Sequence, residues 1–467
     1  MTSTPETIRT VGQLRASGHR QRTVKEELRD NLLARMRDGS PRFPGIVGYD
    51  GTVLPEVERA ILAGHDMVLL GERGQGKTRV IRSLVGLLDE WTPVIEGSEL
   101  NEHPYEPLTP SSRRQAEELG DELPIRWLHR SLRYGEKLAT PDTSVGDLIG
   151  DVDPIRVAQG RTLGDPETIH FGLVPRTNRG IFAVNELPDL AERIQVSLLN
   201  VLEERDIQVR GYQLRLPLDL LLVASANPED YTNRGRIITP LKDRFGAEIR
   251  THYPLELDLE LDLIRQEARL VAEVPDHVLE VVARFARAVR ESPSVDSRSG
   301  VSARFAIAAA ETVAASALRR SGILGEPIST ARIGDTASIT STLRGKVEFE
   351  SGEEGREIEV LAHLLRTATA ETFRARLAGL DLSGFTELVA EGEIVETGEL
   401  VGAEDLLRQV GTVPGLAKVL ERLGFDDAPT AQQAAAGVEF ALEGLHLTRR
   451  LSKAMTDEGR TLYGSRE

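Results

Sequence analysis

The chain has 467 residues, more than one hydrophobic core usually holds, so two or three domains are expected. Its net charge of −17, from 57 basic and 74 acidic residues, disfavours nucleic acid as a partner. The absence of cysteine excludes disulfides and thiol catalysis, and no stretch reaches the ~20 apolar residues that a membrane helix needs. The N-terminal segment lacks the apolar core of a signal peptide, so we expect a cytoplasmic protein.

The first 64 residues lead into the first predicted strand. Residues 1–42 predict a polar arm and an amphipathic helix, with Leu28, Leu32 and Met36 on one face. A loop rich in proline and glycine follows from position 43 and runs into a second helix. Ile46, Val47 and Gly48 in this loop are candidates to line a pocket for a nucleotide base, although ordinary anchoring of the loop explains them equally well.

The strongest motif comes next and reads GERGQGKT, which fills the phosphate-loop template G-x-x-x-x-G-K-[ST]. Its residues are Gly71, Glu72, Arg73, Gly74, Gln75, Gly76, Lys77 and Thr78. An apolar strand over 65–70 precedes it and an apolar-faced helix over 78–88 follows, as the motif requires. We expect backbone amides and Lys77 to bind the phosphates of ATP, and the hydroxyl of Thr78 to bind Mg²⁺.

Residues 96–142 form a polar stretch without sustained periodicity, which predicts a long excursion from an α/β core. The segment 144–153 then leads towards a second apolar strand over 180–186 and a long helix over 187–204. Glu186 ends this strand and is the candidate to orient or activate the attacking water. The alternative is a carboxylate that merely caps the following helix.

Residues 207–216 alternate around Gly211 and predict a β-hairpin. A third apolar strand over 220–224 ends near Asn227, which we expect level with Glu186, because the carboxyl ends of parallel strands meet at one edge of a sheet. The amide of Asn227 can hydrogen-bond the γ-phosphate or the attacking water. A simple Asn-Pro turn is the alternative.

Together these segments resemble the AAA+ ATPase superfamily, and within it the ATPase subunit of magnesium chelatase and the MoxR-type ATPases. The resemblance rests on FPGIVGYD, GERGQGKT, FGLVPRTNRGIFAVNELPDL, the hairpin and SANPEDYTNRGRIITPLKDRFG. It implies an α/β fold with a three-layer core, a parallel sheet between two layers of helices, over residues 43–256. A helical lid with sensor 2 follows over 257–330, then a linker and C-terminal helical region over 331–467; residues 1–42 form the N-terminal arm and helix.

The resemblance also assigns roles to single residues. Asn227 matches the sensor-1 position, and Arg244 matches an arginine finger acting on the ATP of a neighbouring subunit. Arg234 and Arg236 are competitors for the finger, and a surface salt bridge is the alternative for all three. Arg304 matches sensor 2, reaching the γ-phosphate, with Arg298 as the fallback.

One position departs from the family pattern. Where the family ends its second strand with Asp-Glu, this chain has Asn185-Glu186. An amide oxygen can accept a hydrogen bond from a water bound to Mg²⁺, but it adds no charge to the metal site. We therefore expect slow hydrolysis or weakened Mg²⁺ affinity, and an Asn185→Asp variant that changes neither would contradict this expectation.

The C-terminal third carries no motif that we can match. Residues 321–357 are rich in Gly, Ser and Thr and are expected to separate two helical regions, with a short strand over 346–350. From position 358 the pattern is mostly helical, and packing explains these helices better than partner binding. No D-x-S-x-S metal motif is present, so a von Willebrand A domain partner would be a separate protein.

The resemblance implies a ring-forming ATPase, a homo-oligomer of hexameric type, that remodels a partner or inserts a metal into it. Two alternatives remain: an ATP-binding regulatory scaffold with little turnover, and the ATPase subunit of a true tetrapyrrole magnesium chelatase. A sigma-54-type transcriptional activator is disfavoured, because the sequence shows no GAFTGA-like loop and no helix-turn-helix signature.

Overall fold

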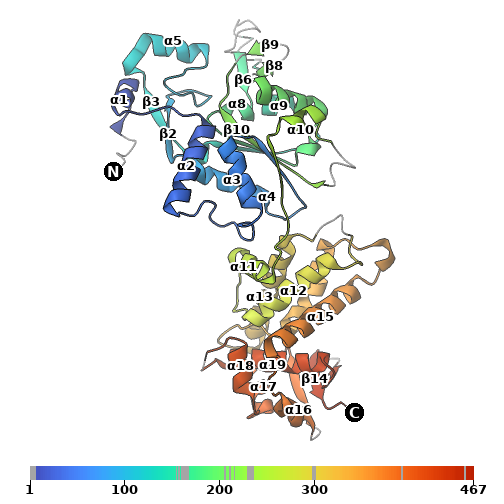
Figure 1. Ribbon diagram of the computed structural model, residues 1–467. Helices are drawn as coiled ribbons and strands as arrows, with labels where there is room; N and C mark the ends of the chain where they lie inside the picture. Colours follow the sequence, from blue (N-terminus) through green and yellow to red (C-terminus); the bar gives the residue numbers. More distant parts are fainter. Residues whose placement is uncertain are drawn as a thin grey trace. The chain divides into compact units, whose positions relative to one another are not determined.

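The computed structural model divides into two compact units, Met1–His252 and Tyr253–Glu467 (Figure 1). The described residues are 7–153, 155, 158, 168–204, 207–209, 212–214, 216–228, 236–296, 301–390, 393–426, 428–456 and 459–466. Among them, no helix combines the length and apolar character needed to cross a membrane. The boundary after His252 falls near the expected one at 256, whereas the expected divisions at 42 and 330 lie inside the units and stay predictions.

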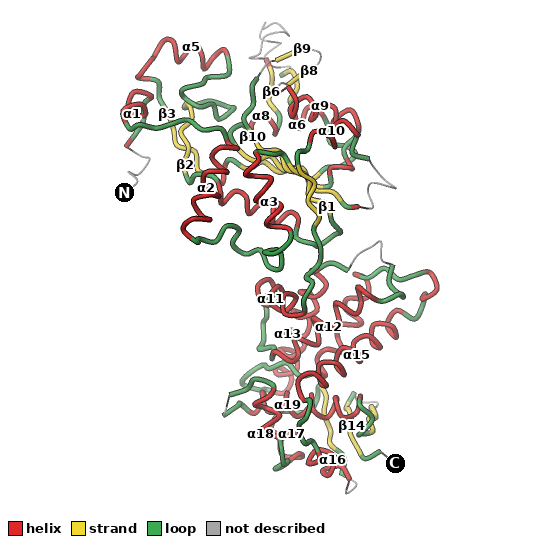
Figure 2. The backbone as a smooth tube through the Cα atoms, in the orientation of Figure 1, coloured by secondary structure: helices red, strands yellow, loops and turns green. Residues whose placement is uncertain are grey.

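A five-stranded parallel sheet forms the centre of the first unit (Figure 2). In spatial order its strands are β11 (Ala247–Arg250), β1 (Met67–Leu70), β10 (Leu220–Ala226), β7 (Gly180–Asn185) and β4 (Tyr134–Leu138). The three middle strands are buried along their whole length, as is typical of parallel strands covered by helices on both faces.

Alternate side chains of the strands enter two different cores. Met67 and Leu69 pack with helices on one face, and Val68 and Leu70 pack with helices on the other. The first face carries α2 (Val24–Asp38), α3 (Val53–Ala63) and α4 (Lys77–Ser83). The second carries α6 (Val145–Leu148), α8 (Leu173–Arg176), α9 (Glu192–Glu204) and α10 (Thr239–Arg244). The resulting three layers confirm the predicted fold class.

The polar stretch before β7 is more ordered than the sequence suggested. β2 (Trp91–Ile95) and β3 (Ile125–His129) pair antiparallel, and they pack with α1 (Val11–Ala16) around a small apolar cluster. α5 (Pro110–Leu119) lies between these strands in the sequence. The expectation of one long excursion over 96–142 was wrong for its last part, because β4 is an edge strand of the central sheet.

Two hairpins and two helix boundaries complete the first unit. β5 (Gly150–Val152) pairs with β6 (Ile169–Phe171), and β8 (Ile207–Val209) pairs with β9 (Tyr212–Leu214), as predicted for the second pair.

The helix after the phosphate loop ends as α4 at Ser83 and continues as a 3₁₀ turn, Leu84–Leu87. The helix expected from Leu187 begins only at Glu192, after a separate 3₁₀ turn, Leu187–Asp189, that contains Pro188.

The second unit is built from helices around one apolar core that runs from Leu261 to Tyr463. Its helices are α11 (Leu257–Glu267), α12 (Asp276–Glu291), α13 (Ala303–Leu324), α14 (Ser338–Leu343), α15 (Glu357–Leu377), α16 (Ser383–Ala390), α17 (Ala403–Val410), α18 (Leu416–Arg422) and α19 (Ala431–Leu447). Residues from the expected lid and from the expected C-terminal region therefore share one core.

Three expectations for this unit need correction. A three-stranded antiparallel sheet, in the order β12 (Val395–Gly398), β14 (Arg460–Gly464) and β13 (Ser452–Met455), interrupts the helical pattern near the C-terminus. The strand expected over 346–350 is absent from these described residues, where Phe349 makes a single bridge to Val295 after a 3₁₀ turn, Arg344–Lys346. The segment 321–357 contains α14 and contributes Ile339 and Leu343 to the core, so it is not a plain separator.

Candidate functional site

The phosphate-loop residues connect β1 to α4 along a path that requires glycine. Gly74 has a φ of 77°, and Gly76, directly before α4, has a φ of 75°. Both values lie in the left-handed region, which residues with a Cβ rarely adopt. A Cβ on Gly71 would lie 1.8 Å from Oγ1 of Thr251. The loop therefore has the close backbone path expected of a phosphate-binding turn at the start of a helix.

The ammonium group of Lys77 lies inside this loop. It donates to the carbonyl oxygen of Gly71, to that of Glu72 at 2.9 Å and to Oδ1 of Asn227 at 2.8 Å. The residue is buried, with 6% of its surface exposed. The geometry places a positive charge where the loop and the carboxyl end of β10 meet.

Asn227 joins this lysine to the proposed catalytic carboxylate. Its Nδ2 donates to Oε2 of Glu186 at 2.7 Å, while its Oδ1 accepts from Lys77. Glu186 has a φ of 55° and makes no side-chain capping bond to the turn that follows. A non-glycine residue in this region is strained, and strain of this kind is common at functional sites. These contacts support the proposed roles of Glu186 and Asn227, which remain predictions.

Asn185 and Thr78 face each other beside this group. Oγ1 of Thr78 lies 3.5 Å from Oδ1 of Asn185, and Oγ of Ser225 donates to the same amide oxygen at 3.2 Å. Magnesium prefers oxygen ligands and usually keeps several waters, so a hydroxyl and an amide oxygen at this spacing fit a hydrated ion bound together with phosphates. The described residues include no group of three or more His, Cys, Asp or Glu suited to hold a metal.

The loop residues proposed for the base pocket lie partly exposed. Ile46 packs against the core of the first helical face, and Gly48 has a φ of 80°. A cavity of about 340 Å³ beside the phosphate loop is lined by other residues, among them Gln75, Pro228 and Thr251. The roles of Ile46, Val47 and Gly48 remain predictions.

The arginine proposed as a finger is the last residue of α10. Arg244 is exposed and pairs with Glu203 at 2.6 Å and with Asp243 at 3.4 Å. This is the surface salt bridge of the alternative interpretation, but exposed pairs of this kind are weak and can be exchanged for another partner. Arg236 is also exposed, and Arg234 lies outside the described residues. Action on a neighbouring subunit remains a prediction.

The proposed sensor-2 residue belongs to the second unit. Arg304 is exposed in the first turn of α13, and the fallback Arg298 lies outside the described residues. Since each unit is placed by itself, the approach of Arg304 to the nucleotide remains a prediction.

Sequence reasoning missed Tyr49, although it lies in the quoted segment FPGIVGYD. Its hydroxyl lies within hydrogen-bond distance of two backbone carbonyls, those of Gln75 in the loop and of His252 at 2.8 Å. Burial raises the pKa of Tyr49 to about 12. Thr251 also contacts the loop, with its Oγ1 donating to Oε1 of Gln75 at 2.8 Å. These side chains hold the loop against the end of β11.

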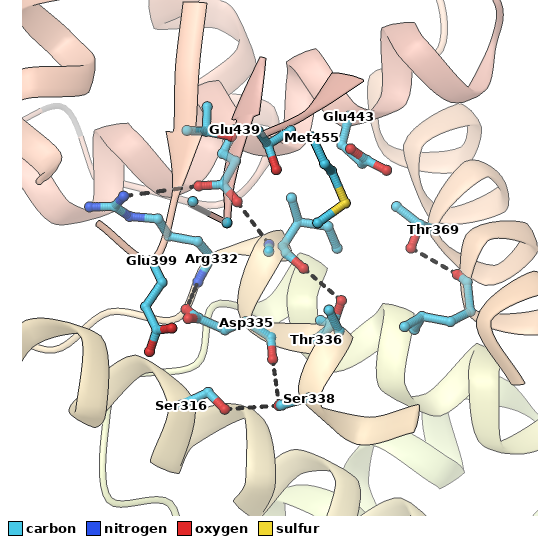
Figure 3. Close-up of a pocket in the computed structure, with 18 of the residues that line it drawn as sticks. Ser316, Arg332, Asp335, Thr336, Ser338, Thr369, Glu399, Glu439, Glu443 and Met455 are labelled. Carbon is cyan, nitrogen blue, oxygen red and sulfur yellow. Dashed lines mark hydrogen bonds and ion pairs between the residues drawn. The ribbon is translucent and has the colours of Figure 1, made fainter. Parts of the chain in front are cut away.

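A second cavity, of about 540 Å³, lies within the second unit (Figure 3). Two nearly fully buried arginines border it and pair with carboxylates. Arg320 contacts Glu326 at 3.0 Å and Asp335 at 3.1 Å, and Arg332 contacts Glu326 at 3.0 Å and Glu439 at 4.0 Å. We call these five residues the arginine cluster. Sequence reasoning did not single out any of them.

Part of the chain is similar in sequence to known proteins. A family model described as "Sigma-54 interaction domain" matches residues 162–244. The magnesium-chelatase subunit ChlI of Nostoc sp. is 29% identical over 242 residues, which make up 50% of this chain and 60% of that protein. The chain thus spans less than two thirds of this curated relative.

Two solved structures are similar at lower identity. A putative ATPase from Cytophaga hutchinsonii is 14% identical with a TM-score of 0.32, and the match covers 76% of this chain and 98% of that one. The complex between subunits BchI and BchD of magnesium chelatase matches at 20% identity with a TM-score of 0.36, over 68% of this chain and 98% of the other.

The sequence match to ChlI and the motifs agree with a three-layer core that carries a phosphate loop between β1 and α4. In sequence and in the fold of its first unit, the chain is related to the AAA+ proteins that include magnesium-chelatase subunit ChlI.

Proposed function

We propose that the chain is a ring-forming ATPase that couples ATP binding and hydrolysis to remodelling of a partner protein or complex, or to metal insertion into it. The observation that carries the proposal is the hydrogen-bonded line from Lys77 through Asn227 to Glu186. It joins a phosphate-binding cation to a carboxylate through an amide that contacts both. A lysine that binds the phosphates and a residue that positions the attacking water are two of the parts that hydrolysis of a terminal phosphate uses.

Binding of the substrate would use the loop between β1 and α4. Backbone amides of the loop would donate to phosphate oxygens, and the start of α4 would add the positive end of a helix dipole. The contacts of Lys77 with the carbonyls of Gly71 and Glu72 can be exchanged for phosphate oxygens. Thr78 and Asn185 would hold hydrated Mg²⁺, which neutralises charge on the phosphates when bound.

The catalytic step would depend on Glu186. Its carboxylate accepts from Asn227, which fixes its position at the end of β7 and leaves acceptor capacity to orient a water. Arg244 would supply positive charge to the ATP of a neighbouring subunit, which makes turnover depend on assembly. Arg304 would contact the γ-phosphate from the second unit.

Similarity to known proteins supports a proposal about the partners. The solved complex pairs subunit BchI with subunit BchD, so we propose that this chain also works with a separate protein, one that carries a von Willebrand A domain. We expect a homo-oligomer, a hexamer by the family's pattern. Action as a tetrapyrrole chelatase subunit is the narrower form of the proposal, supported by the match to ChlI.

Asn185 favours a second candidate function. A neutral amide where the family pattern has an aspartate gives the metal site less charge, and slow turnover would make the protein an ATP-binding regulatory scaffold. Both candidates share the same nucleotide site and differ in the rate of hydrolysis.

Steady-state ATPase activity across a series of protein concentrations tests the proposal, with oligomer size read by mass photometry. We expect the rate per chain to rise with assembly. Glu186→Gln should lower it by about 10²- to 10⁴-fold because it removes the base, and Arg244→Ala by about 10³-fold because it removes the finger. Both variants should still bind ATP.

Arg37→Ala, at an exposed position in the last turn of α2, is the matched control and should keep full activity. ATP binding without turnover at any concentration would favour the scaffold. Activity that is independent of assembly and unaffected by Arg244→Ala would contradict action between subunits.

A further inference from the structure

Glu136, which the proposed mechanism does not use, lies directly beside Asn185. It belongs to β4, the strand next to β7 in the sheet. Nδ2 of Asn185 donates to Oε1 of Glu136 at 2.6 Å. Tyr134 donates to Oε2 at 3.0 Å. Arg82 donates to both oxygens, through Nε at 2.8 Å and Nη2 at 3.0 Å.

This contact determines which way the amide of Asn185 points. A carboxylate offers only acceptors, so the NH₂ group of the amide must face Glu136. The oxygen of the amide then faces the opposite way, towards Oγ1 of Thr78 at 3.5 Å and Oγ of Ser225 at 3.2 Å. Without a carboxylate at position 136, an amide turned by 180° would present two donors to the metal side.

The same carboxylate is connected to the helix that follows the phosphate loop. Arg82 lies four residues after Thr78 on α4, so the two side chains lie on one face of that helix. The side chain of Glu136 is 21% exposed, and that of Arg82 is 63% exposed. Glu136 therefore holds β7 and α4 in a fixed relation at the proposed Mg²⁺ site.

We propose that Glu136 is a positioning residue that turns the amide oxygen of Asn185 towards Thr78. The carboxylate of this pair then sits on β4, and Asn185, the last residue of β7, supplies a neutral amide. An aspartate at position 185 would bring two carboxylates into direct contact, so an amide is the side chain that this neighbour accepts. This inference rests on the proposed function, since it assigns Thr78 and Asn185 to Mg²⁺.

A swap of the two groups tests the proposal, with Glu136→Gln, Asn185→Asp and the double variant. The measurements are the Tm of the nucleotide-free protein and the affinity for a non-hydrolysable ATP analogue with and without Mg²⁺. In Glu136→Gln the oxygen of the new amide pairs with Arg82, and its NH₂ group faces Asn185. The amide of Asn185 then turns by 180°, so that its own oxygen accepts from this NH₂ group. We expect the gain in affinity from Mg²⁺ to fall about tenfold, the effect of one charge-assisted hydrogen bond.

Asn185→Asp alone should lower the Tm of the nucleotide-free protein, because two carboxylates meet. In the double variant both the Tm and the gain in affinity from Mg²⁺ should return towards the wild-type values. The introduced carboxylate at position 185 would accept from the introduced amide at position 136, so the pair would again contain one carboxylate. Glu117→Gln, an exposed position on α5, is the control and should change neither quantity.

Additive effects in the double variant, or an unchanged Mg²⁺ effect in Glu136→Gln, would overturn the positioning role. A wild-type protein that binds no nucleotide would overturn the proposed function instead. The Tm values of the four proteins need no nucleotide, and they would still decide whether the two side chains act together.

Discussion

The phosphate loop and the arginine cluster are two polar groups built on buried cations, and they differ in the partners of those cations. Lys77 contacts two backbone carbonyls and one amide oxygen. Arg320 and Arg332 contact the carboxylates of Glu326, Asp335 and Glu439.

This difference separates a site that can receive an anion from one whose cations are already neutralised by carboxylates. Carbonyl and amide oxygens hold an ammonium through dipoles, and phosphate oxygens can replace them at little cost. A carboxylate cancels the charge of its arginine, and removal of either partner leaves the other buried and uncompensated. We infer that the first group serves binding and that the second serves stability.

The largest effect is expected in the arginine cluster. Arg332→Ala would remove this arginine from the buried carboxylates of Glu326 and Glu439. The free energy of unfolding should therefore fall by about 3–5 kcal/mol. Urea titration followed by circular dichroism measures this change. ATP affinity should remain that of the wild type.

Arg422→Ala, at an exposed position on α18, controls for loss of an arginine from the same unit and should be neutral. A large loss of ATP affinity in Arg332→Ala without loss of stability would contradict a purely stabilising role for the arginine cluster.

The phosphate loop should respond in the opposite way. Lys77→Ala removes the cation that meets the phosphates, and ATP affinity should fall about a hundredfold, equivalent to about 3 kcal/mol. The stability of the nucleotide-free protein should change much less than in Arg332→Ala. Calorimetric titration with ATP measures the affinity, and Lys418→Ala on the exposed side of α18 is the control. Retained affinity would show that the loop does not bind phosphate through this side chain.

The smallest effect concerns His277, a polar group in the core of the second unit whose ring nitrogens have no hydrogen-bond partner among the described residues. Burial lowers its pKa to about 3, against about 6.5 in an unfolded chain. Between these values the unfolded chain binds one more proton, so stability falls as the pH drops below 6.5. His277→Leu should reduce the loss of unfolding free energy between pH 7 and pH 5 by about 1–2 kcal/mol.

Thermal or urea unfolding at both pH values measures this difference. His363→Leu, at an exposed position on α15, should leave the pH dependence as in the wild type. Equal pH dependence in His277→Leu and the wild type would mean that His277 is hydrated or protonated in the folded protein.

The sequence predicted the phosphate loop and the central strands because their signals are local. Glycine spacing and short apolar runs specify the path from β1 to α4, and the ends of β7 and β10 follow from parallel pairing. The sequence therefore predicts that Asn227 and Glu186 lie close together, and the two side chains are hydrogen-bonded.

Features that depend on distant or polar partners could not be predicted. β4 reads YGEKL and is partly exposed at the sheet edge, so its pattern is not that of a buried strand. Glu136 and Asn185 are 49 residues apart in the sequence, and only the pairing of β4 with β7 joins them. The small sheet of the second unit likewise pairs Val395 with Tyr463. Its strands are too short to stand out from the helices between them.

Tyr49 has one hydroxyl hydrogen, yet two carbonyl oxygens compete for it. With a pKa of about 12 the phenol keeps this hydrogen at neutral pH. It can donate to Gln75 or to His252 but not to both at once. Movement of the phosphate loop that withdraws the Gln75 carbonyl frees the hydrogen for His252, the last residue of the first unit. The single hydroxyl hydrogen of Tyr49 can therefore bond either the phosphate loop or the carbonyl of the residue at which the first unit ends.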